Sequence, residues 1–164
     1  MRRSIWARSA LALAISMWLA GSPLAIAQPT SLPASVLTPS TDNSVLRNQL
    51  TLARKLERQA LEGIRALPGD DSAPIDPISL QAARDAYVLM RVVRHGMTWQ
   101  MERRKFPDPI QDLVFKRVED AWNLSRTPVD RATWATERAE YVRISVRDMS
   151  QALRLLDQAL ALMQ

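Results

Sequence analysis

Residues 105–111 read KFPDPIQ, a stretch that ends one helix and begins the next. Proline disfavours the helical conformation of the residue before it, so Phe106-Pro107 predicts the end of a helix. Aspartate accepts hydrogen bonds from free backbone N–H groups at a helix start. Proline fits the first helical position because its missing donor is not needed there. Asp108-Pro109 therefore predicts that a new helix begins immediately.

The same kind of punctuation divides the chain at two further places. Residues 67–78, LPGDDSAPIDPI, stop a helix at Pro68-Gly69 and start another at Asp76-Pro77. Residues 127–130, TPVD, are typical of a capping box, in which an acidic residue follows the capping threonine by three positions. No alternating run between these points indicates a strand. The sequence therefore predicts helices over residues 44–67, 76–105, 108–126 and 127–164.

Apolar residues repeat at helical spacing in the first and last of these helices, which indicates one buried side on each. Short connections favour antiparallel neighbours. The expected fold class is therefore all-α, an antiparallel up-down-up-down four-helix bundle over residues 44–164. Its expected core includes Leu46, Leu50, Ala53, Ala60, Leu61 and Ile64, and, from the last helix, Trp134, Tyr141, Val142, Met149, Ala152, Leu153, Leu156, Leu160 and Met163.

Residues 1–27 have the three parts of a secretory signal peptide. Arg2, Arg3 and Arg8 form a basic start, residues 10–20 form a short apolar run, and Ala25-Ile26-Ala27 forms a cleavage site. The apolar run is too short to span a bilayer, so we expect no stable membrane anchor after cleavage. Residues 28–43 are rich in Pro, Ser and Thr, which predicts a flexible linker. The expected location is the periplasm, with the extracellular medium as an alternative.

The charge of the chain excludes some classes of function. Its 22 basic and 17 acidic residues give a formal net charge of +5, but removing the three leader arginines leaves 19 basic residues and a charge of only +2. A nucleic-acid-binding protein usually carries a clustered basic surface, and this near balance argues against that class. The chain has no cysteine. Disulfides, thiolate metal sites and covalent haem attachment through cysteine are therefore excluded.

The second expected helix is apolar on two sides. One side carries Ala83, Ala86, Met90, Val93, Met97 and Met101, and the other carries Val88, Val92, His95 and Trp99. A helix that is apolar on two sides is usually buried on both. Either this helix is central in the bundle, or the side with Val88, Val92, His95 and Trp99 is an interface for a partner protein or a second copy of the chain.

Four charged residues fall within or beside the apolar rows: Glu57, Arg94, Arg117 and Arg138. Counting residues from the connections places the three arginines at similar heights along the bundle. Because guanidinium groups bind carboxylates and phosphates in pairs of hydrogen bonds, these residues predict an interior pocket for a small anionic ligand. Two alternatives stay open. The arginines can extend to water along the edge of an apolar row, or one of them can simply pair with Glu57.

An enzyme of this architecture is a further hypothesis. The chain is similar to exported chorismate mutases in its expected all-helical architecture and in Lys105 followed by Ile110-Gln111-Asp112, although their glutamine-bearing final helix is absent. The resemblance implies a cofactor-free enzyme acting on a small dicarboxylate. Under it, Arg94, Arg117 and Arg138 would bind the carboxylates and Glu57 would form a hydrogen bond with the substrate.

A metal- or haem-binding bundle is the remaining alternative. His95 lies close in sequence to Met90, Met97 and Met101, and imidazole and thioether groups suit copper or haem iron. His95 projects from a different side of the helix, however, so these residues cannot hold one ion within it. We therefore expect no metal ion and no cofactor. The favoured interpretation is a non-enzymatic binding or interaction protein of the bacterial cell envelope.

Overall fold

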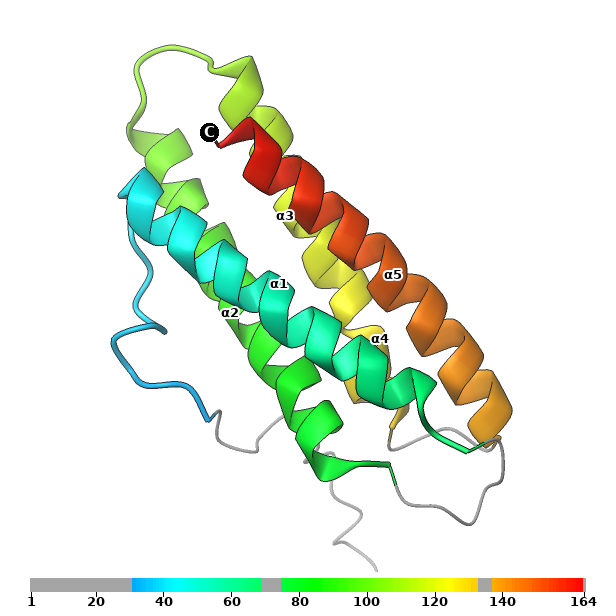
Figure 1. Cartoon of the computed structure of the whole chain (residues 1–164). Coiled ribbons are helices and arrows are strands. Elements are labelled where there is room, and N and C mark those ends of the chain that lie inside the picture. The colour runs from blue at the N-terminus through cyan, green and yellow to red at the C-terminus, as the bar shows by residue number, and fades with distance from the viewer. Residues whose placement is uncertain (1–30, 69–74, 133–136, 164) are drawn as a thin grey trace, which may run out of the picture.

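The structure, a computed structural model, describes residues 31–68, 75–132 and 137–163. Within these residues the chain forms helices and no strand, which confirms the all-α fold class. Four long helices pack against one another, with a short helix beside them (Figure 1). The expected leader, residues 28–30 of the expected linker and Trp134 lie outside the described residues. The helices are α1 (Asn43–Arg65), α2 (Pro77–Arg103), α3 (Pro109–Ser125), α4 (Thr127–Arg131) and α5 (Arg138–Leu162).

The predicted starts of α2 and α3 are confirmed. The side chain of Asp76 accepts hydrogen bonds from the backbone N–H groups of Ile78 and Ser79, and a proline occupies the first turn. Asp108 caps α3 in the same way. None of the helices in the described part of the chain has a stretch long and apolar enough to cross a membrane.

The prediction of one continuous helix from Thr127 is wrong. The five-residue α4 ends at Arg131, and α5 begins only at Arg138. The capping box does not form because both of its side chains bind elsewhere. The Thr127 hydroxyl donates a hydrogen bond to Asp148 Oδ2 on α5, at 2.9 Å. Asp130 accepts one from Arg126 Nε at 2.5 Å.

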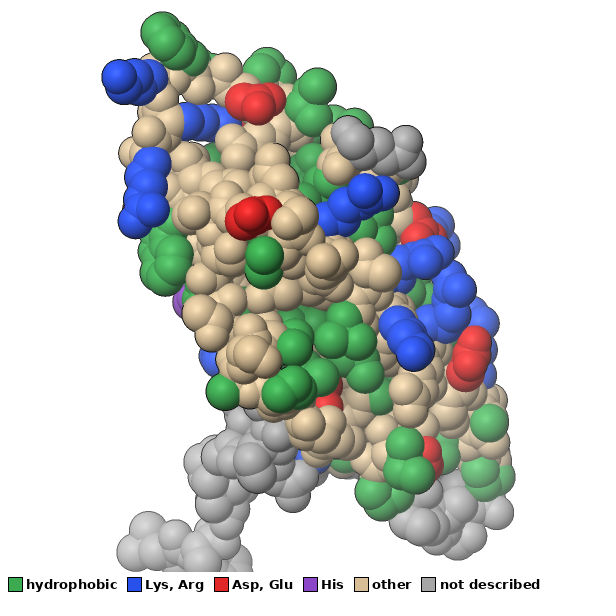
Figure 2. All heavy atoms as spheres, turned by 60° about the vertical axis from the view of Figure 1, so that its left-hand side comes forward, with side chains coloured by type: hydrophobic (Ala, Val, Ile, Leu, Met, Phe, Trp, Pro, Cys, Tyr) green, Lys and Arg blue, Asp and Glu red, His purple; other side chains and the backbone are tan. Residues whose placement is uncertain are grey.

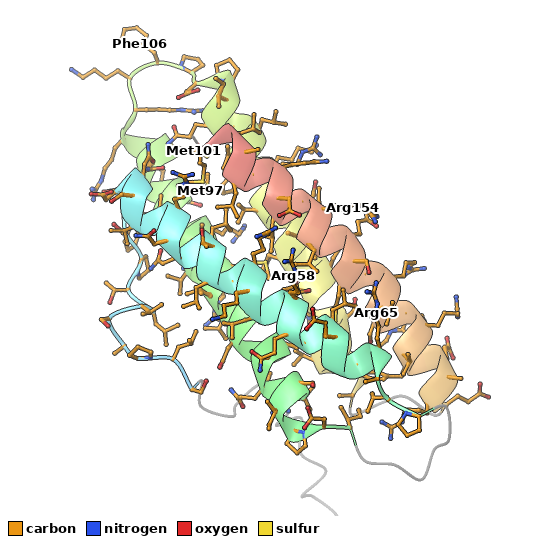
Figure 3. All side chains as sticks on the ribbon, in the orientation of Figure 1. Arg58, Arg65, Met97, Met101, Phe106 and Arg154 are labelled. Atoms are coloured by element: carbon orange, nitrogen blue, oxygen red, sulfur yellow. The ribbon has the colours of Figure 1, made fainter. Side chains whose placement is uncertain are left out.

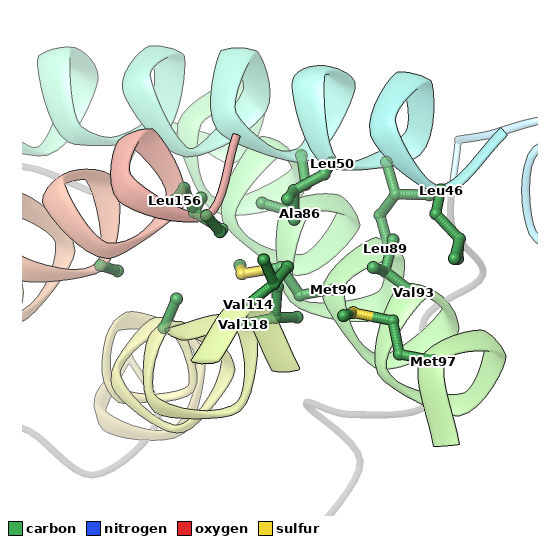
Figure 4. Packing of buried hydrophobic residues seen from close by; sticks show 14 residues of the cluster. Leu46, Leu50, Ala86, Leu89, Met90, Val93, Met97, Val114, Val118 and Leu156 are labelled. Carbon is green, nitrogen blue, oxygen red and sulfur yellow. The ribbon is translucent and has the colours of Figure 1, made fainter. Parts of the chain in front are cut away.

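The apolar rows form two neighbouring clusters of buried side chains. One joins Leu46 and Leu50 of α1 to Val114 and Val118 of α3, and to Leu156 of α5 (Figure 4). The other surrounds the C-terminal end of α1. Every core residue expected of α1 is buried. Ala152, Leu156 and Ala159 belong to the first cluster, so the C-terminal half of α5 packs against other helices of this chain. The second cluster comprises Ala60, Leu61, Ile64, Ala82, Ala83, Val129, Tyr141, Met149 and Leu153.

Residues 31–42, which we name the N-terminal strap, lie against α1 and α2, at the left of Figure 1. The side-chain amide of Gln49 donates hydrogen bonds to the carbonyl oxygens of Val36 and Thr38, at 2.8 and 3.0 Å. Gln100 donates one to the Thr41 carbonyl oxygen at 2.6 Å. A Cβ atom at Gly96 would stand 2.1 Å from the carbonyl oxygen of Ser40. This part of the expected linker thus packs on the bundle, and a glycine permits the close approach.

Candidate functional site

Glu57 lies inside the bundle, where the apolar row of α1 predicts it. It is 0% exposed and sits between the two buried clusters, after Ala53 of one and before Ala60 of the other. The Ser125 hydroxyl, at the end of α3, donates a hydrogen bond to Glu57 Oε1 at 2.9 Å and lies 3.8 Å from the sulfur of Met90. The other oxygen of Glu57, Oε2, is buried and has no hydrogen-bond partner among the described residues.

Burial controls the charge of Glu57. Loss of water around the carboxyl group raises its pKa from 4.5 to about 8, and the hydrogen bond from Ser125 opposes this rise only in part. No arginine side chain contributes to this shift among the described residues. Glu57 is therefore protonated and neutral at pH 7, and it needs no cation beside it.

Arg94 does not point at Glu57. Its guanidinium group lies between α2 and α3, where Nε and Nη2 approach Glu119 Oε1 at 3.1 and 3.0 Å. The same group stands 5.1 Å from the ring centre of Trp122, a distance typical of a cation–π contact. Arg94 is thus held by an acid and an aromatic ring at the edge of the core, with part of its side chain in water.

The other two predicted arginines have different surroundings from those of Arg94. Arg138 stands at the start of α5 near Tyr141, whose hydroxyl donates a hydrogen bond to the Pro128 carbonyl oxygen at 3.1 Å. Burial raises the pKa of Tyr141, and the positive charge of Arg138 opposes that rise. Arg117, on α3, is half-buried and has no hydrogen-bond or ion-pair partner among the described residues.

The contacts of the described residues do not join the four residues predicted for an anionic pocket into one site. None of them lines the hollow beside Gln100 and Ile110 or the hollow beside Ser31 and Gln81. Such a pocket needs several cationic groups around one cavity. Here one arginine pairs with Glu119, another neighbours Tyr141, and the carboxyl of Glu57 is enclosed by apolar side chains and Ser125.

Two other buried acids, Asp85 and Asp148, were not among the predicted site residues. Asp85 accepts hydrogen bonds from the Gln81 amide at 2.9 Å and from the backbone N–H and hydroxyl of Ser31. Asp148 accepts hydrogen bonds from Thr127 and from Arg147 Nε, the latter at 2.7 Å. Both lie in the apolar rows of their helices, which is the pattern that identified Glu57. Their partners attach the strap and α4 to the bundle, so these acids have a structural role.

The second apolar side of α2 is divided between interior and surface. Val92 is only 8% exposed and Val88 is half-buried, whereas His95 is exposed and Trp99 is 44% exposed. Asp85, Val92 and Gly96 share one side of the helix at spacings of seven and four residues. The strap contacts the first and last of these three. Part of this side is therefore covered by the chain itself.

Exposed apolar side chains gather instead at one end of the bundle, where the α2–α3 connection meets the end of α5. Phe106 is 80% exposed and projects from the connection (Figure 3), and Ile110 is 59% exposed. Leu113 and Leu162 are also exposed. We name these four residues the apolar end. Figure 2 shows hydrophobic side chains at the upper edge of the molecule. A small cavity of about 120 Å³ opens beside it, lined by Asn43, Met97, Gln100, Asp108, Ile110, Gln111, Val114, Leu162 and Met163.

The residues behind the chorismate mutase resemblance lie at this same end, away from Glu57. Lys105 is exposed, Gln111 donates a hydrogen bond to Gln100 at 2.7 Å, and Asp112 pairs with Arg104 at 2.5 Å. Within the described ranges, no three histidine or acidic side chains come together as a metal-ligand group. The chain matches no protein-family model, no curated protein and no solved structure.

Proposed function

We propose that this protein is an exported, non-enzymatic interaction protein of the bacterial cell envelope. In this proposal residues 1–27 direct export and are removed, and the mature chain acts in the periplasm as an up-down-up-down bundle. It binds a partner protein through the apolar end. The observation that carries the proposal is the exposure of Phe106 and Ile110 beside a small cavity.

The chemistry of the apolar end suits a protein partner. Fully burying a side chain such as Phe or Ile contributes about 1.5–3 kcal/mol, so a partner that covers both gains appreciable free energy. The cavity of about 120 Å³ is smaller than the range of about 300–1,000 Å³ found for small-molecule sites. It is large enough for one side chain of a partner. Asp108, Gln111 and the Arg104–Asp112 pair supply a polar rim around the apolar side chains.

The geometry gives less support to a small anionic ligand or an enzyme. The pocket predicted for either function needs cationic groups that converge on a cavity. Arg94 instead pairs with Glu119, Arg138 neighbours Tyr141, and no arginine of the described chain acts on the carboxyl group of Glu57. The expected result with the purified mature chain is therefore no conversion of chorismate to prephenate above the uncatalysed rate.

Site-specific crosslinking in cells tests the proposed surface. A photoreactive amino acid replaces Phe106 in one variant and Arg91, which is exposed on α2, in a matched control. The proposal predicts a discrete crosslinked product from position 106 that is absent from position 91. The product should disappear when Ile110→Ser and Leu113→Ser are added, while circular dichroism shows an intact fold.

The mass of the crosslinked product identifies the partner. A product of twice the mass of the mature chain indicates a homodimer, and any other discrete mass indicates a different protein. Absence of a product from position 106, or the same products from both positions, would contradict the proposal.

A further inference from the structure

Two rows of arginines with the same spacing lie on the side of the molecule formed by α1 and α5. On each helix the three arginines stand at positions i, i+4 and i+11, which places them on one side of that helix. Two contacts join the α1 row to α5: Arg65 Nη2 donates a hydrogen bond to the Ser150 hydroxyl at 3.1 Å, and Arg54 pairs with Asp157. We name this surface the arginine face; it comprises Arg54, Arg58 and Arg65 of α1 and Arg143, Arg147 and Arg154 of α5.

The two contacts also set the level of each arginine. Because Arg54 meets Asp157 and Arg65 meets Ser150, α1 and α5 run in opposite directions (Figure 1). Arg58 of α1 is then at the same level as Arg154 of α5, since both helices rise equally per residue. Figure 3 shows Arg58 and Arg65 rising from α1 on the side of α5, and Arg154 on α5 itself.

The positive charge of this face is only partly neutralised. Arg54 and Arg147 have carboxylate partners, Asp157 and Asp148. Arg58, Arg143 and Arg154 are exposed and have no hydrogen-bond or ion-pair partner among the described residues. Basic side chains accordingly gather at the right of Figure 2, where α1 lies.

Helix α1 itself contributes little compensating negative charge. It carries five basic and two acidic residues, and one of the two acids, Glu57, is buried and protonated. The other, Glu62, is exposed but forms no ion pair among the described residues. An anionic partner would therefore meet several guanidinium groups that no side chain of the described residues occupies.

We propose that the arginine face is the docking surface for an acidic segment of a partner protein, with carboxylates spaced along it to meet the arginines. The guanidinium fork matches a carboxylate in shape and charge. The chain already uses this pairing, in Arg54 with Asp157 and in Arg94 with Glu119. The inference does not depend on the apolar end, which lies at another part of the bundle.

An acidic protein segment fits this face better than an anionic membrane does. Proteins that bind at a membrane surface usually insert apolar side chains between their basic ones. The exposed large hydrophobic residues of the described chain all lie outside residues 54–65 and 143–154. The most exposed of them, Phe106, is on the α2–α3 connection, so the arginine face offers charge without an apolar wedge.

A binding experiment with two synthetic helical peptides of equal composition tests this proposal. One peptide carries glutamates at i, i+4 and i+11 on one side, and the other distributes the same glutamates around the helix. Each is titrated with the mature chain and followed by fluorescence anisotropy at 50 mM NaCl. The patterned peptide is expected to bind about tenfold more tightly. Arg58→Glu with Arg154→Glu should remove that preference, because each reversal replaces an attraction by a repulsion.

Matched variants separate the face from the overall charge. Arg91→Glu with Lys116→Glu changes the net charge equally at exposed positions of α2 and α3, and should weaken binding less than about threefold. Arg58→Lys with Arg154→Lys keeps the charge but loses the fork, and should fall between. Circular dichroism confirms that each variant is folded.

Three results would overturn the proposal. The first is equal binding of the two peptides, and the second is equal weakening by the face and control reversals. The third is binding of vesicles containing phosphatidylglycerol that depends on Arg58 and Arg154, with no peptide preference, which would assign the face to a membrane.

Discussion

The interior of the bundle and the arginine face lie on different sides of α1, and they hold charge in opposite ways. Inside, Glu57 is a carboxyl group without a cation, and burial keeps it neutral. Outside, Arg58 and Arg154 are cations without a carboxylate on the described chain. Both groups lack a charged partner on the described chain, but one is buried and the other is exposed to water. The carboxyl group of Glu57 therefore stays neutral inside the bundle, whereas the guanidinium groups of Arg58 and Arg154 are accessible to another molecule.

This difference has a thermodynamic consequence. A buried carboxyl must either find a partner or remain protonated, whereas an exposed arginine is solvated at little cost. Changes to the interior should therefore alter stability strongly. Changes at Arg58 and Arg154 of the arginine face should leave stability nearly unchanged and alter association instead.

The largest expected effect is at Glu57. The unfolded chain ionises this residue above pH 4.5, but the folded protein retains the proton up to about pH 8. Stability from this group is thus fully present below pH 4.5 and is lost progressively as the pH rises toward 8. The stability of Glu57→Gln relative to the natural chain should grow by about 3 kcal/mol from pH 4 to pH 7.

Urea denaturation at several pH values measures this change. The matched control is Glu62→Gln, at an exposed position on the same helix, which should change stability by less than about 0.5 kcal/mol at each pH. A constant difference between Glu57→Gln and the natural chain over this range would show that Glu57 is ionised in the folded protein.

A second prediction concerns the strap, which sets the boundary between interior and surface on α2. Replacing a glycine within a helix by alanine ordinarily stabilises it by about 1 kcal/mol. At Gly96 the added Cβ atom would collide with the backbone oxygen of Ser40. Gly96→Ala should therefore destabilise the protein by about 1–3 kcal/mol and speed proteolytic cleavage within residues 31–42. Stabilisation would mean that the strap does not rest against α2.

A third, smaller effect is expected at Arg94, which belongs to neither side of the comparison. Its pairing with Glu119 and its contact with Trp122 are partly exposed. Arg94→Ala should destabilise the protein by about 1 kcal/mol. Arg91→Ala, at an exposed position three residues earlier, should change stability by less than about 0.5 kcal/mol. Equal effects in thermal unfolding would argue that Arg94 is not held between α2 and α3.

The smallest expected change in stability is on the arginine face. Arg58→Ala should alter the unfolding free energy by no more than about 0.5 kcal/mol, because no partner is lost. Removing one of several like charges should also weaken the dependence of stability on salt. A loss above about 1 kcal/mol in 150 mM NaCl would indicate that Arg58 has a structural partner, and would weaken the case for docking.

Local signals predicted much of the fold. Asp76-Pro77 and Asp108-Pro109 begin helices because each needs only its immediate neighbours to form a cap. The break after Arg131 was not predictable in this way. Thr127 and Asp130 match a capping box locally, but Thr127 is drawn to Asp148, 21 residues away in sequence. A long-range hydrogen bond thus replaced the local one.

The candidate site was harder to predict for the same reason. The apolar row of α1 placed Glu57 inside correctly, since burial of a helix side follows from its period. Counting residues gave the arginines a common height but not their directions around the bundle. Arg94 lies at the edge of its row and reaches Glu119, a partner that α2 alone does not reveal. The packing of the strap on the bundle was not predicted, because Leu32, Val36 and Leu37 have no helical period although they pack against the core.

The protonation state of Glu57 is the most direct test of the claim that this buried carboxyl group is neutral and has no arginine beside it. Labelling glutamate side chains with carbon-13 and assigning the Glu57 carboxyl by comparison with Glu57→Gln allows its titration to be followed by NMR. The result expected is a carboxyl that remains protonated at pH 7 and titrates near pH 8. A Glu57 carboxyl that titrates at or below pH 4.5 would mean that water, hydrogen bonds or a cation stabilise its charge, and would contradict the burial of Glu57 as a neutral group.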